Sequence, residues 1–304
     1  MAQDIIRVKE LTKKYDDLVA VDSISFSVKE GEIFSLVGPN GAGKTTTVEI
    51  LECLREPTSG SAHVLGHDVR KEDEMIKGKI GVMPQNFNTF ERLTAEENIK
   101  LMGDMYGSDN VEEIMKKVGV DEFKDKKFAD LSGGMKTKVG IGMTLISNAD
   151  LLFLDEPTTG LDPHARRETW NLIKDLKKMG KTVFLTTHYM EEVEHLSDRA
   201  GILIDGNIEV IDSIENLIEH HGGGMKVKVL EDGEAEEIIH ERADEVLESE
   251  NGTLTGIFDD KKEARQALVK LFQLDAKVEV REAGMDEVFI RLTGGKIDEG
   301  GEMV

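Results

Sequence analysis

Residues 38–45, GPNGAGKT, decide the fold class of this chain. They fit the pattern G-x-x-x-x-G-K-[ST], follow the apolar segment EIFSLV and precede a helical pattern, TTTVEILECL. A strand, a glycine-rich turn and a helix start in this order form a phosphate-binding loop, because exposed backbone N–H groups and the helix dipole attract anions. We expect Lys44 to neutralise the β and γ phosphates of a nucleotide and the Thr45 hydroxyl to ligate Mg²⁺.

An acidic pair follows a second apolar segment, LLFLD, at residues 151–155. A short, wholly apolar run predicts a buried strand of a parallel sheet. Asp155 at its end is placed to hold the magnesium ion of the phosphate site. Glu156 is the next residue, and we interpret it as the base that orients the attacking water; the alternative is an exposed loop carboxylate.

Two more polar residues follow apolar strands. His188 ends the segment TVFLTTH, and Gln85 lies in GVMPQNF. The carboxyl ends of parallel strands meet at one edge of a sheet, which is where α/β proteins bind ligands. We expect His188 to contact the γ phosphate, although a histidine in such a position is also commonly structural. Taken alone, Gln85 is an ordinary loop glutamine.

A second helix start with anion-binding character lies in residues 130–140, DLSGGMKTKVG. A serine and two glycines precede a pattern in which Met135, Val139 and Met143 recur at helical spacing. Such a start presents N–H groups and the positive end of a helix dipole. The chain therefore has two candidate phosphate-binding helix starts far apart in sequence, and one nucleotide in one chain does not explain both.

The composition excludes several classes of protein. The chain has 304 residues, with 38 basic against 61 acidic residues and a net charge of −23, which opposes nonspecific binding to nucleic acid or to an anionic membrane surface. No apolar run approaches the roughly 18 to 20 residues that a membrane span needs. The first residues, MAQDIIRVKEL, lack the apolar core of a targeting signal. A single cysteine, Cys53, excludes an intrachain disulfide and suits a reducing cytosol.

The sequence pattern predicts two domains and a tail. Alternating strands are expected within residues 5–37, mostly helices within 92–147, and a hairpin with an Asp-Gly turn in GILIDGNIEVID. The three glycines at 222–224 are the best linker candidate in the chain. We therefore predict an ATPase-type domain over residues 1–222, a small α/β domain over 225–293, and a loose tail over 294–304.

Taken together, these motifs resemble those of the ATP-binding subunits of ABC transporters, in the order and spacing of that family over roughly residues 3–222. GPNGAGKT resembles the Walker A motif, LSGGM at 131–135 the family signature, LLFLDEP the Walker B motif, and TGLD at 159–162 the D-loop with Asp162. Gln85 matches the Q-loop and its magnesium ligand, His188 the switch histidine, and Tyr15 the A-loop ring that stacks on adenine. The resemblance implies that ATP contacts Gly38, Asn40, Gly41, Gly43, Lys44, Thr45 and Thr46.

The resemblance also implies a fold and an assembly. The fold is an α/β P-loop NTPase of ABC type, with a mixed-sheet ATPase core, an antiparallel β subdomain, an α-helical signature subdomain and a small C-terminal α/β appendage. Two such subunits pair head to tail, so Ser132, Gly133 and Gly134 would serve the ATP of the partner subunit. One departure is the run Lys136-Thr137-Lys138, where the family leads us to expect a Gln-Arg or Arg-Arg pair.

The region after residue 222 is similar to the C-terminal extension of drug, antibiotic and sodium exporter ATPases, through DEVFIRLTGG and, earlier, TSGSAHVLGHDV at 58–69. This similarity implies an ATPase, with ATP and Mg²⁺, that drives a separate transmembrane permease subunit from the cytoplasmic face of the membrane, with a second ATPase subunit and no nucleic acid as partner. The alternatives are the ATPase of an ABC importer and a soluble ABC-type ATPase acting on ribosomes or DNA.

Overall fold

The computed structural model describes residues 3–230, 233–248, 253–274 and 276–294. These residues form two compact units that divide between Asp212 and Ser213: the described residues up to Asp212 are unit 1, and those from Ser213 are unit 2. The predicted tail over 294–304 lies outside the described residues from position 295 onward.

A six-stranded sheet carries the predicted motifs of unit 1, in the order β10-β9-β3-β8-β7-β6. Its strands are β3 (Ile33–Val37), β6 (Ile80–Met83), β7 (Leu151–Asp155), β8 (Thr182–Thr187), β9 (Arg199–Ile204) and β10 (Asn207–Ser213). The pairings of β3 with β8 and β9, of β7 with β8, and of β6 with β7 are all parallel. All residues of β3 and β8 are buried, because each face of a parallel sheet is covered. The prediction of buried parallel strands is confirmed.

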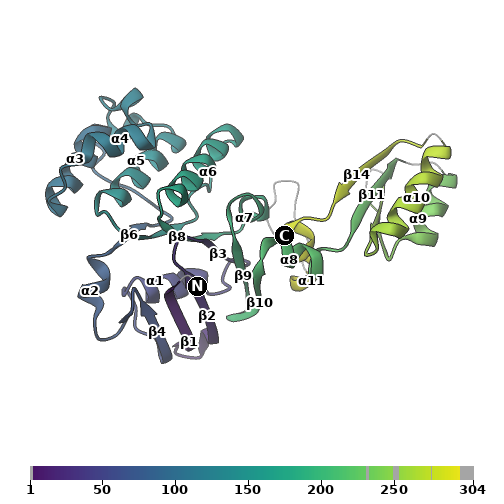
Figure 1. The fold of residues 1–304 in the computed structure, drawn as a ribbon, viewed down its shortest axis with the longest axis horizontal. Coiled ribbons are helices and arrows are strands. Elements are labelled where there is room, and N and C mark those ends of the chain that lie inside the picture. Colours follow the sequence, from purple (N-terminus) through teal and green to yellow (C-terminus); the bar gives the residue numbers. More distant parts are fainter. Residues whose placement is uncertain (1–2, 231–232, 249–252, 275, 295–304) are drawn as a thin grey trace. The chain divides into compact units, whose positions relative to one another are not determined.

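A second, antiparallel sheet lies at one end of unit 1, as Figure 1 shows. Its order is β2-β1-β4-β5, and its strands are β1 (Asp4–Tyr15), β2 (Leu18–Lys29), β4 (Ser59–Val64) and β5 (His67–Asp68). The alternating burial of β1 and β2 turns one face of this sheet toward the six-stranded sheet. There Phe26 stacks on Phe34 at 5.6 Å between ring centroids, which joins the two sheets in one core.

Three helices gather at the opposite end of unit 1 (Figure 1), namely α3 (Ala95–Tyr106), α4 (Val111–Val118) and α5 (Gly133–Ile146). α3 begins with a capping box: Thr94 accepts from the N–H of Glu97, and Glu97 accepts from the N–H of Thr94. Their buried faces share a core with β7, β8 and α6. The predicted helical subdomain over 92–147 thus has a core continuous with the large sheet.

The remaining helices of unit 1 are α1 (Lys44–Leu51), α2 (Asp73–Lys77), α6 (Pro163–Lys178) and α7 (Met190–Leu196). Three of them each follow a strand of the six-stranded sheet, and α2 precedes β6. α1 follows β3, α6 follows β7, and α7 follows β8, so each of these helices begins near the carboxyl end of its strand.

Unit 2 is a four-stranded antiparallel sheet with two helices packed on one face. The sheet has the order β12-β13-β11-β14, and the unit contains β11 (Met225–Leu230), α9 (Gly233–Arg242), β12 (Glu245–Glu248), β13 (Thr253–Phe258), α10 (Lys261–Gln273), β14 (Val278–Glu282) and α11 (Met285–Thr293). The chain order βαββαβ with this strand order is the ferredoxin-like arrangement. The predicted small α/β domain over 225–293 thus has both strands and helices, and β12 is its least evident strand in the sequence, because EVLE lacks an alternating apolar pattern.

The division between the units differs from the predicted boundary at residue 222. The first turns of unit 2 are α8 (Ile214–Leu217) and a π-helical turn, Ile218–Gly222. Gly222 is buried, and a Cβ there would contact Ile218, Val288 and Ala283. The glycine run is therefore packed against α11 inside unit 2, where a small residue is needed, and is not a solvated linker.

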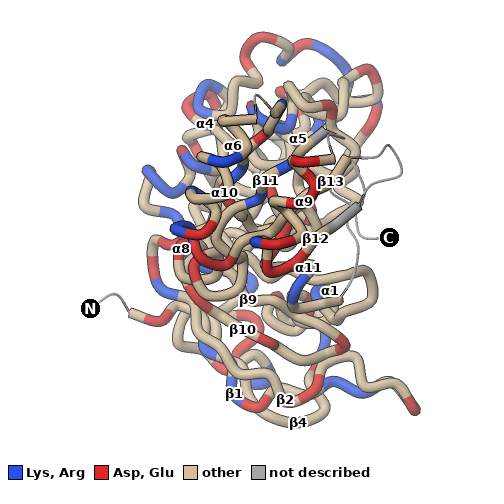
Figure 2. The backbone as a smooth tube through the Cα atoms, turned by 90° about the vertical axis from the view of Figure 1, so that its right-hand side faces the viewer, with Lys and Arg blue, Asp and Glu red and all other residues tan. Residues whose placement is uncertain are grey.

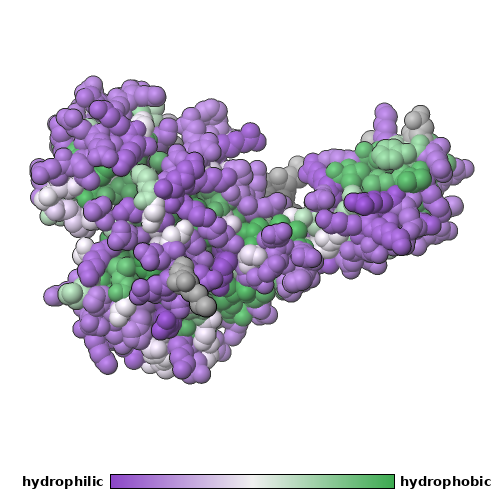
Figure 3. Space-filling model, viewed as in Figure 1, coloured by the Kyte–Doolittle hydropathy of each residue, from purple (hydrophilic) through white to green (hydrophobic). Residues whose placement is uncertain are grey.

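On the face drawn in Figure 3, each unit is mostly hydrophilic and has some apolar areas. Basic and acidic residues alternate along the tube of Figure 2, so neither sign is confined to one segment of the described chain. Among the described helices, none combines the length and apolar character required to cross a membrane.

Candidate active site

A pocket lies at the carboxyl ends of the parallel strands of unit 1. Its lining is Tyr15, Leu18, Ala20, Asn40, Gly41, Gly43, Lys44, Thr45, Thr46, Gln85 and Glu156. The predicted adenine-side residue, the phosphate loop, the Q-loop residue and one Walker B carboxylate therefore meet at one place. No residue of the 130–140 stretch, all of which the structure describes, belongs to this lining.

The phosphate loop depends on glycine at two positions. Gly43 caps α1 with φ 103°, in the left-handed region, and a Cβ there would lie 2.3 Å from the carbonyl oxygen of Ala20. A Cβ on Gly38 would lie 2.1 Å from the carbonyl oxygen of Leu203. The loop therefore turns tightly between its neighbours, and its N–H groups at the start of α1 stay available to an anion.

Lys44 is buried, and its ammonium group folds back over the loop. It donates to the carbonyl oxygens of Gly38 at 2.7 Å and Pro39 at 3.0 Å. Burial lowers the pKa of Lys44, while the charges of Glu156 and Asp155 raise it. A buried cation with only carbonyl partners is a suitable site for the negative charge of a phosphate.

Asp155, at the end of β7, is half-buried and fixed by β8. The hydroxyl of Thr186 donates to its Oδ1. Burial raises the pKa of the Asp155 carboxyl, and the hydrogen bond from Thr186 acts in the opposite direction. A nearby divalent cation would favour the charged form.

Glu156 has a backbone conformation that the sequence did not indicate, with φ 47°. A left-handed non-glycine residue is strained and is held here by bonds from its N–H to the carbonyl oxygen of Thr186 (3.1 Å) and to the Thr186 hydroxyl (3.2 Å). This turn directs the side chain back toward the sheet edge, so that Glu156 is not an exposed loop carboxylate: its side chain is only 8% exposed.

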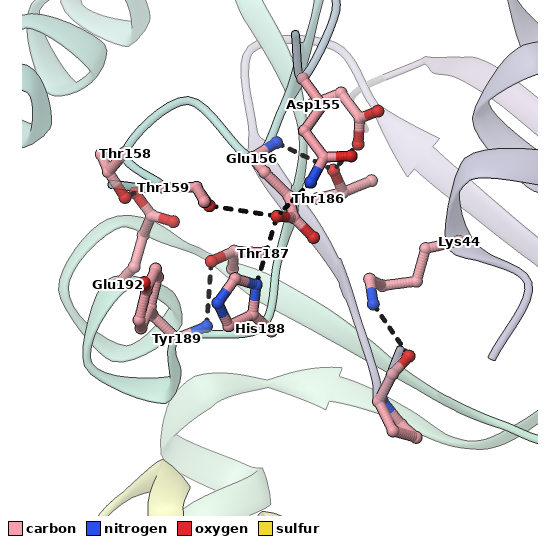
Figure 4. A network of polar contacts seen from close by, with 12 residues as sticks. Lys44, Asp155, Glu156, Thr158, Thr159, Thr186, Thr187, His188, Tyr189 and Glu192 are labelled. Carbon is pink, nitrogen blue, oxygen red and sulfur yellow. Dashed lines mark hydrogen bonds and ion pairs between the residues drawn. The ribbon is translucent and has the colours of Figure 1, made fainter. Parts of the chain in front are cut away.

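Three groups surround the Glu156 carboxylate, and all contact Oε2. Figure 4 shows two of them, Thr159 and His188. Gln85 donates from Nε2 at 2.8 Å, Thr159 from its hydroxyl at 3.1 Å, and His188 Nδ1 lies at 3.3 Å. The hydrogen bond with His188 lowers the pKa of Glu156 more than burial raises it. The carboxylate is therefore ionised near neutral pH, and Gln85 and His188, which were predicted from separate strands, meet on it.

Tyr15 lies at the end of β1 and lines the same pocket. The ammonium of Lys13 lies 5.0 Å and the guanidinium of Arg55 lies 5.6 Å from the centroid of its ring. A partly exposed aromatic ring at a pocket rim offers a face on which a planar base can stack.

The signature stretch forms a helix start, as predicted. Ser132 is the N-cap of α5 and accepts from the N–H of Met135 at 3.4 Å. Ser132 and Gly133 are exposed, whereas a Cβ on Gly133 or Gly134 would lie 2.9 Å from Leu161 or Ala165 respectively. The two glycines therefore let α5 approach the D-loop and α6 closely, and the serine faces solvent outside the pocket of its own chain.

The sequence comparisons identify the family. Residues 21–159 match the family model described as ABC transporter. The chain is 32% identical to the daunorubicin/doxorubicin resistance ATP-binding protein of Streptomyces peucetius, over 97% of this chain and 94% of that protein. The chain belongs to the ABC transporter family. This ABC protein is also 34% identical to the Nod factor export ATP-binding protein I of Mesorhizobium japonicum, over 95% of the chain and 86% of the relative.

The structural comparison agrees with this assignment. A dimeric ATP-binding cassette in a post-hydrolysis state, bound to ADP and Pi, has 30% sequence identity and a TM-score of 0.62. The match covers 68% of this chain and 98% of the cassette. The ABC fold predicted from the sequence is confirmed, and the chain is an ATP-binding, ATP-hydrolysing subunit.

Sequence reasoning missed four side chains around the site. Thr159 and Thr186 hold Glu156 and Asp155, while Thr158 and Glu192 form a buried bond behind them at 2.9 Å. The threonines are common residues in strand ends and turns, so their type carries no signal. Glu192 carried none either, because its burial, on a helix whose other charged residues face solvent, is seen only in the structure.

Proposed function

We propose that this ABC ATPase powers an exporter, as the nucleotide-hydrolysing subunit of a complex with a separate membrane subunit. The observation that carries the proposal is the meeting of Lys44, Gln85 and Glu156 around one pocket at the carboxyl edge of a parallel sheet. The exporter assignment is supported by the relatives, which are named for antibiotic resistance and for Nod factor export.

We assign the phosphate groups of ATP to the loop of residues 38–46. The N–H groups at the start of α1 and the buried ammonium of Lys44 neutralise phosphate charge, and Tyr15 stacks on adenine. Lys44 exchanges its carbonyl partners for phosphate oxygens, which gives the buried cation an anionic hydrogen-bond partner.

The residues proposed for Mg²⁺ are Thr45, Gln85 and Asp155. A hydroxyl, an amide oxygen and a carboxylate are the hard oxygen ligands that this ion prefers. Asp155 is oriented by Thr186, and Gln85 lies against Glu156, so both donors are positioned by the same strand ends. When bound, the ion would supply charge stabilisation for the transferring phosphoryl group.

We assign the hydrolytic step to Glu156. Its ionised carboxylate orients the attacking water and accepts its proton, and His188 contacts the γ phosphate. The bonds from Gln85 and Thr159 fix the carboxylate before substrate arrives, which is the preorganisation that electrostatic catalysis requires.

The second helix start implies a second subunit. Ser132 is exposed at the N-terminus of α5 but does not line the ATP pocket of its own chain. We propose that Ser132, Gly133 and Gly134 contact the γ phosphate of ATP bound to another copy in a head-to-tail pair, with Asp162 of the D-loop at the same interface. A two-fold pair of such contacts gives two ATP molecules per dimer.

We propose a contact with the membrane subunit at an apolar groove beside Gln85. Its lining includes Pro84 and Phe87 of the Q-loop, Met102 and Tyr106 of α3, and Glu52 at the end of α1. A segment of the membrane subunit that binds here would contact the residues next to Gln85, and Gln85 donates to Glu156. The groove thus supplies a short physical path between a transmembrane partner and the catalytic carboxylate. The complex would lie at the cytoplasmic face of the membrane.

Purification of a tagged Glu156→Gln variant from detergent-solubilised membranes, with ATP present, tests this proposal. We expect a polytopic membrane protein to co-purify in stoichiometric amount, and expect it to be lost when Phe87 is changed to Asp. Stoichiometric recovery of ribosomal proteins or DNA instead would favour a soluble ABC ATPase. Transport of its substrate into the cell, measured in vesicles, would identify an importer.

A further inference from the structure

A buried carboxylate lies behind the catalytic residues. Glu192, on α7, has an exposed fraction of 0%. Its Oε1 accepts from the Thr158 hydroxyl at 2.9 Å and from the Trp170 indole Nε1 at 3.0 Å. Thr158 belongs to the loop after β7, and Trp170 belongs to α6. One side chain therefore joins the helix that follows β8 to the two segments that follow β7.

Each end of this bridge is close to a proposed catalytic residue. Thr158 precedes Thr159, whose hydroxyl donates to Glu156. The N–H of Glu192 donates to the carbonyl oxygen of Tyr189, the residue after His188. Figure 4 shows Glu156 and His188 pointing toward each other, and their 3.3 Å contact joins the same two loops on the pocket side. The loops are thus fixed to each other twice, once at the pocket and once in the interior.

A second contact strengthens the same connection. The guanidinium of Arg166, on α6, lies 4.4 Å from the centroid of the Tyr189 ring, and that ring lies 4.1 Å from the ring of His188. The N–H of Arg166 donates to the carbonyl oxygen of Asp162, the N-cap of α6. The start of α6 therefore touches the neighbour of His188 directly.

The interior carboxylate has an energetic cost that apolar packing does not have. Burial raises the pKa of Glu192, and the hydrogen bonds with Thr187, Thr158 and Trp170 and the charge of Arg166 act in the opposite direction. A leucine of similar size would avoid this cost. A role in orientation, which needs directed acceptors, explains the carboxyl better than a role in packing.

We propose that Glu192 is a positioning residue for ATP hydrolysis, holding the loop after β7 and α6 against α7 so that Glu156 and His188 keep their relative placement. This inference rests on the proposed roles of Glu156 and His188. Because Asp162 of the D-loop is the N-cap of α6, the same bridge connects the D-loop to His188. A displacement of the D-loop is thereby passed to the catalytic pair.

Steady-state ATPase kinetics of three variants test the inference. Glu192→Leu and Thr158→Val each remove the Thr158–Glu192 bond, so we expect kcat to fall about tenfold or more while KM for ATP changes less than twofold. Glu192→Gln should recover kcat to within about threefold of wild type, because its amide oxygen can accept both bonds. A wild-type kcat in both Thr158→Val and Glu192→Leu would overturn the inference, as would an equal loss in Glu192→Gln and Glu192→Leu.

A matched control shows whether kcat depends on the Thr158–Glu192 bond or on the loss of any buried threonine hydroxyl. Thr169, on α6, is 1% exposed and donates only within its own helix, to the carbonyl oxygen of Ala165 at 2.9 Å. Thr169→Val should keep kcat and KM. If Glu192→Leu does not fold by thermal melting, Thr158→Val decides the question alone. If Glu156→Gln abolishes hydrolysis while neither Thr158→Val nor a folded Glu192→Leu slows it, the proposed function stands and only the role of Glu192 is wrong.

Discussion

The starts of α1 and α5 are both helix N-termini that present glycines and backbone N–H groups, yet their surroundings differ. The start of α1 lies in a pocket with the buried Lys44 and with Glu156, the carboxylate that follows β7. The start of α5 is exposed and has no residue in that pocket. The first has the groups needed to bind and hydrolyse ATP, and the second has only the groups needed to contact an anion. We therefore propose that one chain carries one nucleotide site and one contact for the site of another chain.

The largest effect should come from a variant in the ATP pocket at the start of α1 that leaves ATP binding intact. Glu156→Gln keeps the size of the side chain and its bond to Gln85 but removes the base. We expect ATP hydrolysis to fall by about a thousandfold or more while the ATP dissociation constant changes little. Size-exclusion chromatography with ATP and Mg²⁺ should show a stable dimer. Turnover near the wild-type rate would exclude Glu156 as the base.

The α5 side is tested by two variants of nearly equal shape. Asn and Asp are both good N-caps, so Ser132→Asn and Ser132→Asp should preserve the start of α5. Only Asp places a negative charge where the phosphate of the partner subunit is proposed to lie. We expect Ser132→Asp to hydrolyse ATP about a hundredfold more slowly than Ser132→Asn, with equal ATP binding by the monomer.

The ATPase rates of Ser132→Asp and Ser132→Asn distinguish two explanations, because a helix cap alone predicts that Ser132→Asp is at least as active as Ser132→Asn. If Ser132 is only a helix cap, Asp should be as good as Asn or slightly better, since its charge interacts favourably with the helix dipole. Equal ATPase rates and equal dimer formation in the two variants would therefore contradict the proposal that Ser132 contacts the ATP of a second subunit.

Lys44→Ala should weaken ATP binding by the monomer, which the Ser132 variants should leave unchanged. It removes a buried charge beside the phosphates within one chain, so ATP binding to the monomer itself should weaken. Loss of a hydrogen bond to a charged group typically costs about 1.5 to 3 kcal/mol, or roughly a 10- to 150-fold increase in the dissociation constant by calorimetry. An unchanged affinity would mean that the two helix starts do not differ as proposed.

Much of this contrast could be predicted from the sequence, because its signals are local. The P-loop pattern fixes a strand, a turn and a helix, and the apolar runs before Asp155 and His188 fix two more strands with their polar ends on one edge. The family resemblance supplied the second subunit. These predictions needed only residues that are close in sequence and the rule that parallel strands end at the same edge of a sheet.

The features that were missed depend on contacts between distant segments. The left-handed backbone of Glu156 is held by Thr186 from another strand, and the buried acceptor for Thr158 comes from Glu192 on another helix. The linker interpretation of residues 222–224 was wrong for the same reason, since Gly222 packs against Val288 on α11. No local pattern contains such pairs.

The smallest expected effect is a pH dependence of stability that arises at the C-terminal end of α1 and is absent at the corresponding end of α5. Glu52 is the C-cap of α1 and is 6% exposed, and burial together with the charges of Asp155 and Glu49 raises its pKa to about 8. Between its ordinary value of 4.5 and about 8, the folded protein keeps a proton that the unfolded chain has lost. The free energy of unfolding therefore falls as the pH rises through this interval.

Glu52→Gln places a neutral group at the same position and removes this dependence. The variant should match wild type at pH 5 and become more stable by about 1 to 2 kcal/mol at pH 8, because the groove beside Glu52 lets some water reach the wild-type carboxylate. Denaturant unfolding between pH 5 and 8.5 measures the difference. Ser147, the C-cap of α5, offers no titrating group, so Ser147→Ala should shift stability equally at every pH. A difference between Glu52→Gln and wild type that does not grow with pH would show that Glu52 is already ionised in the folded protein, and that the end of α1 carries no more electrostatic cost than the end of α5.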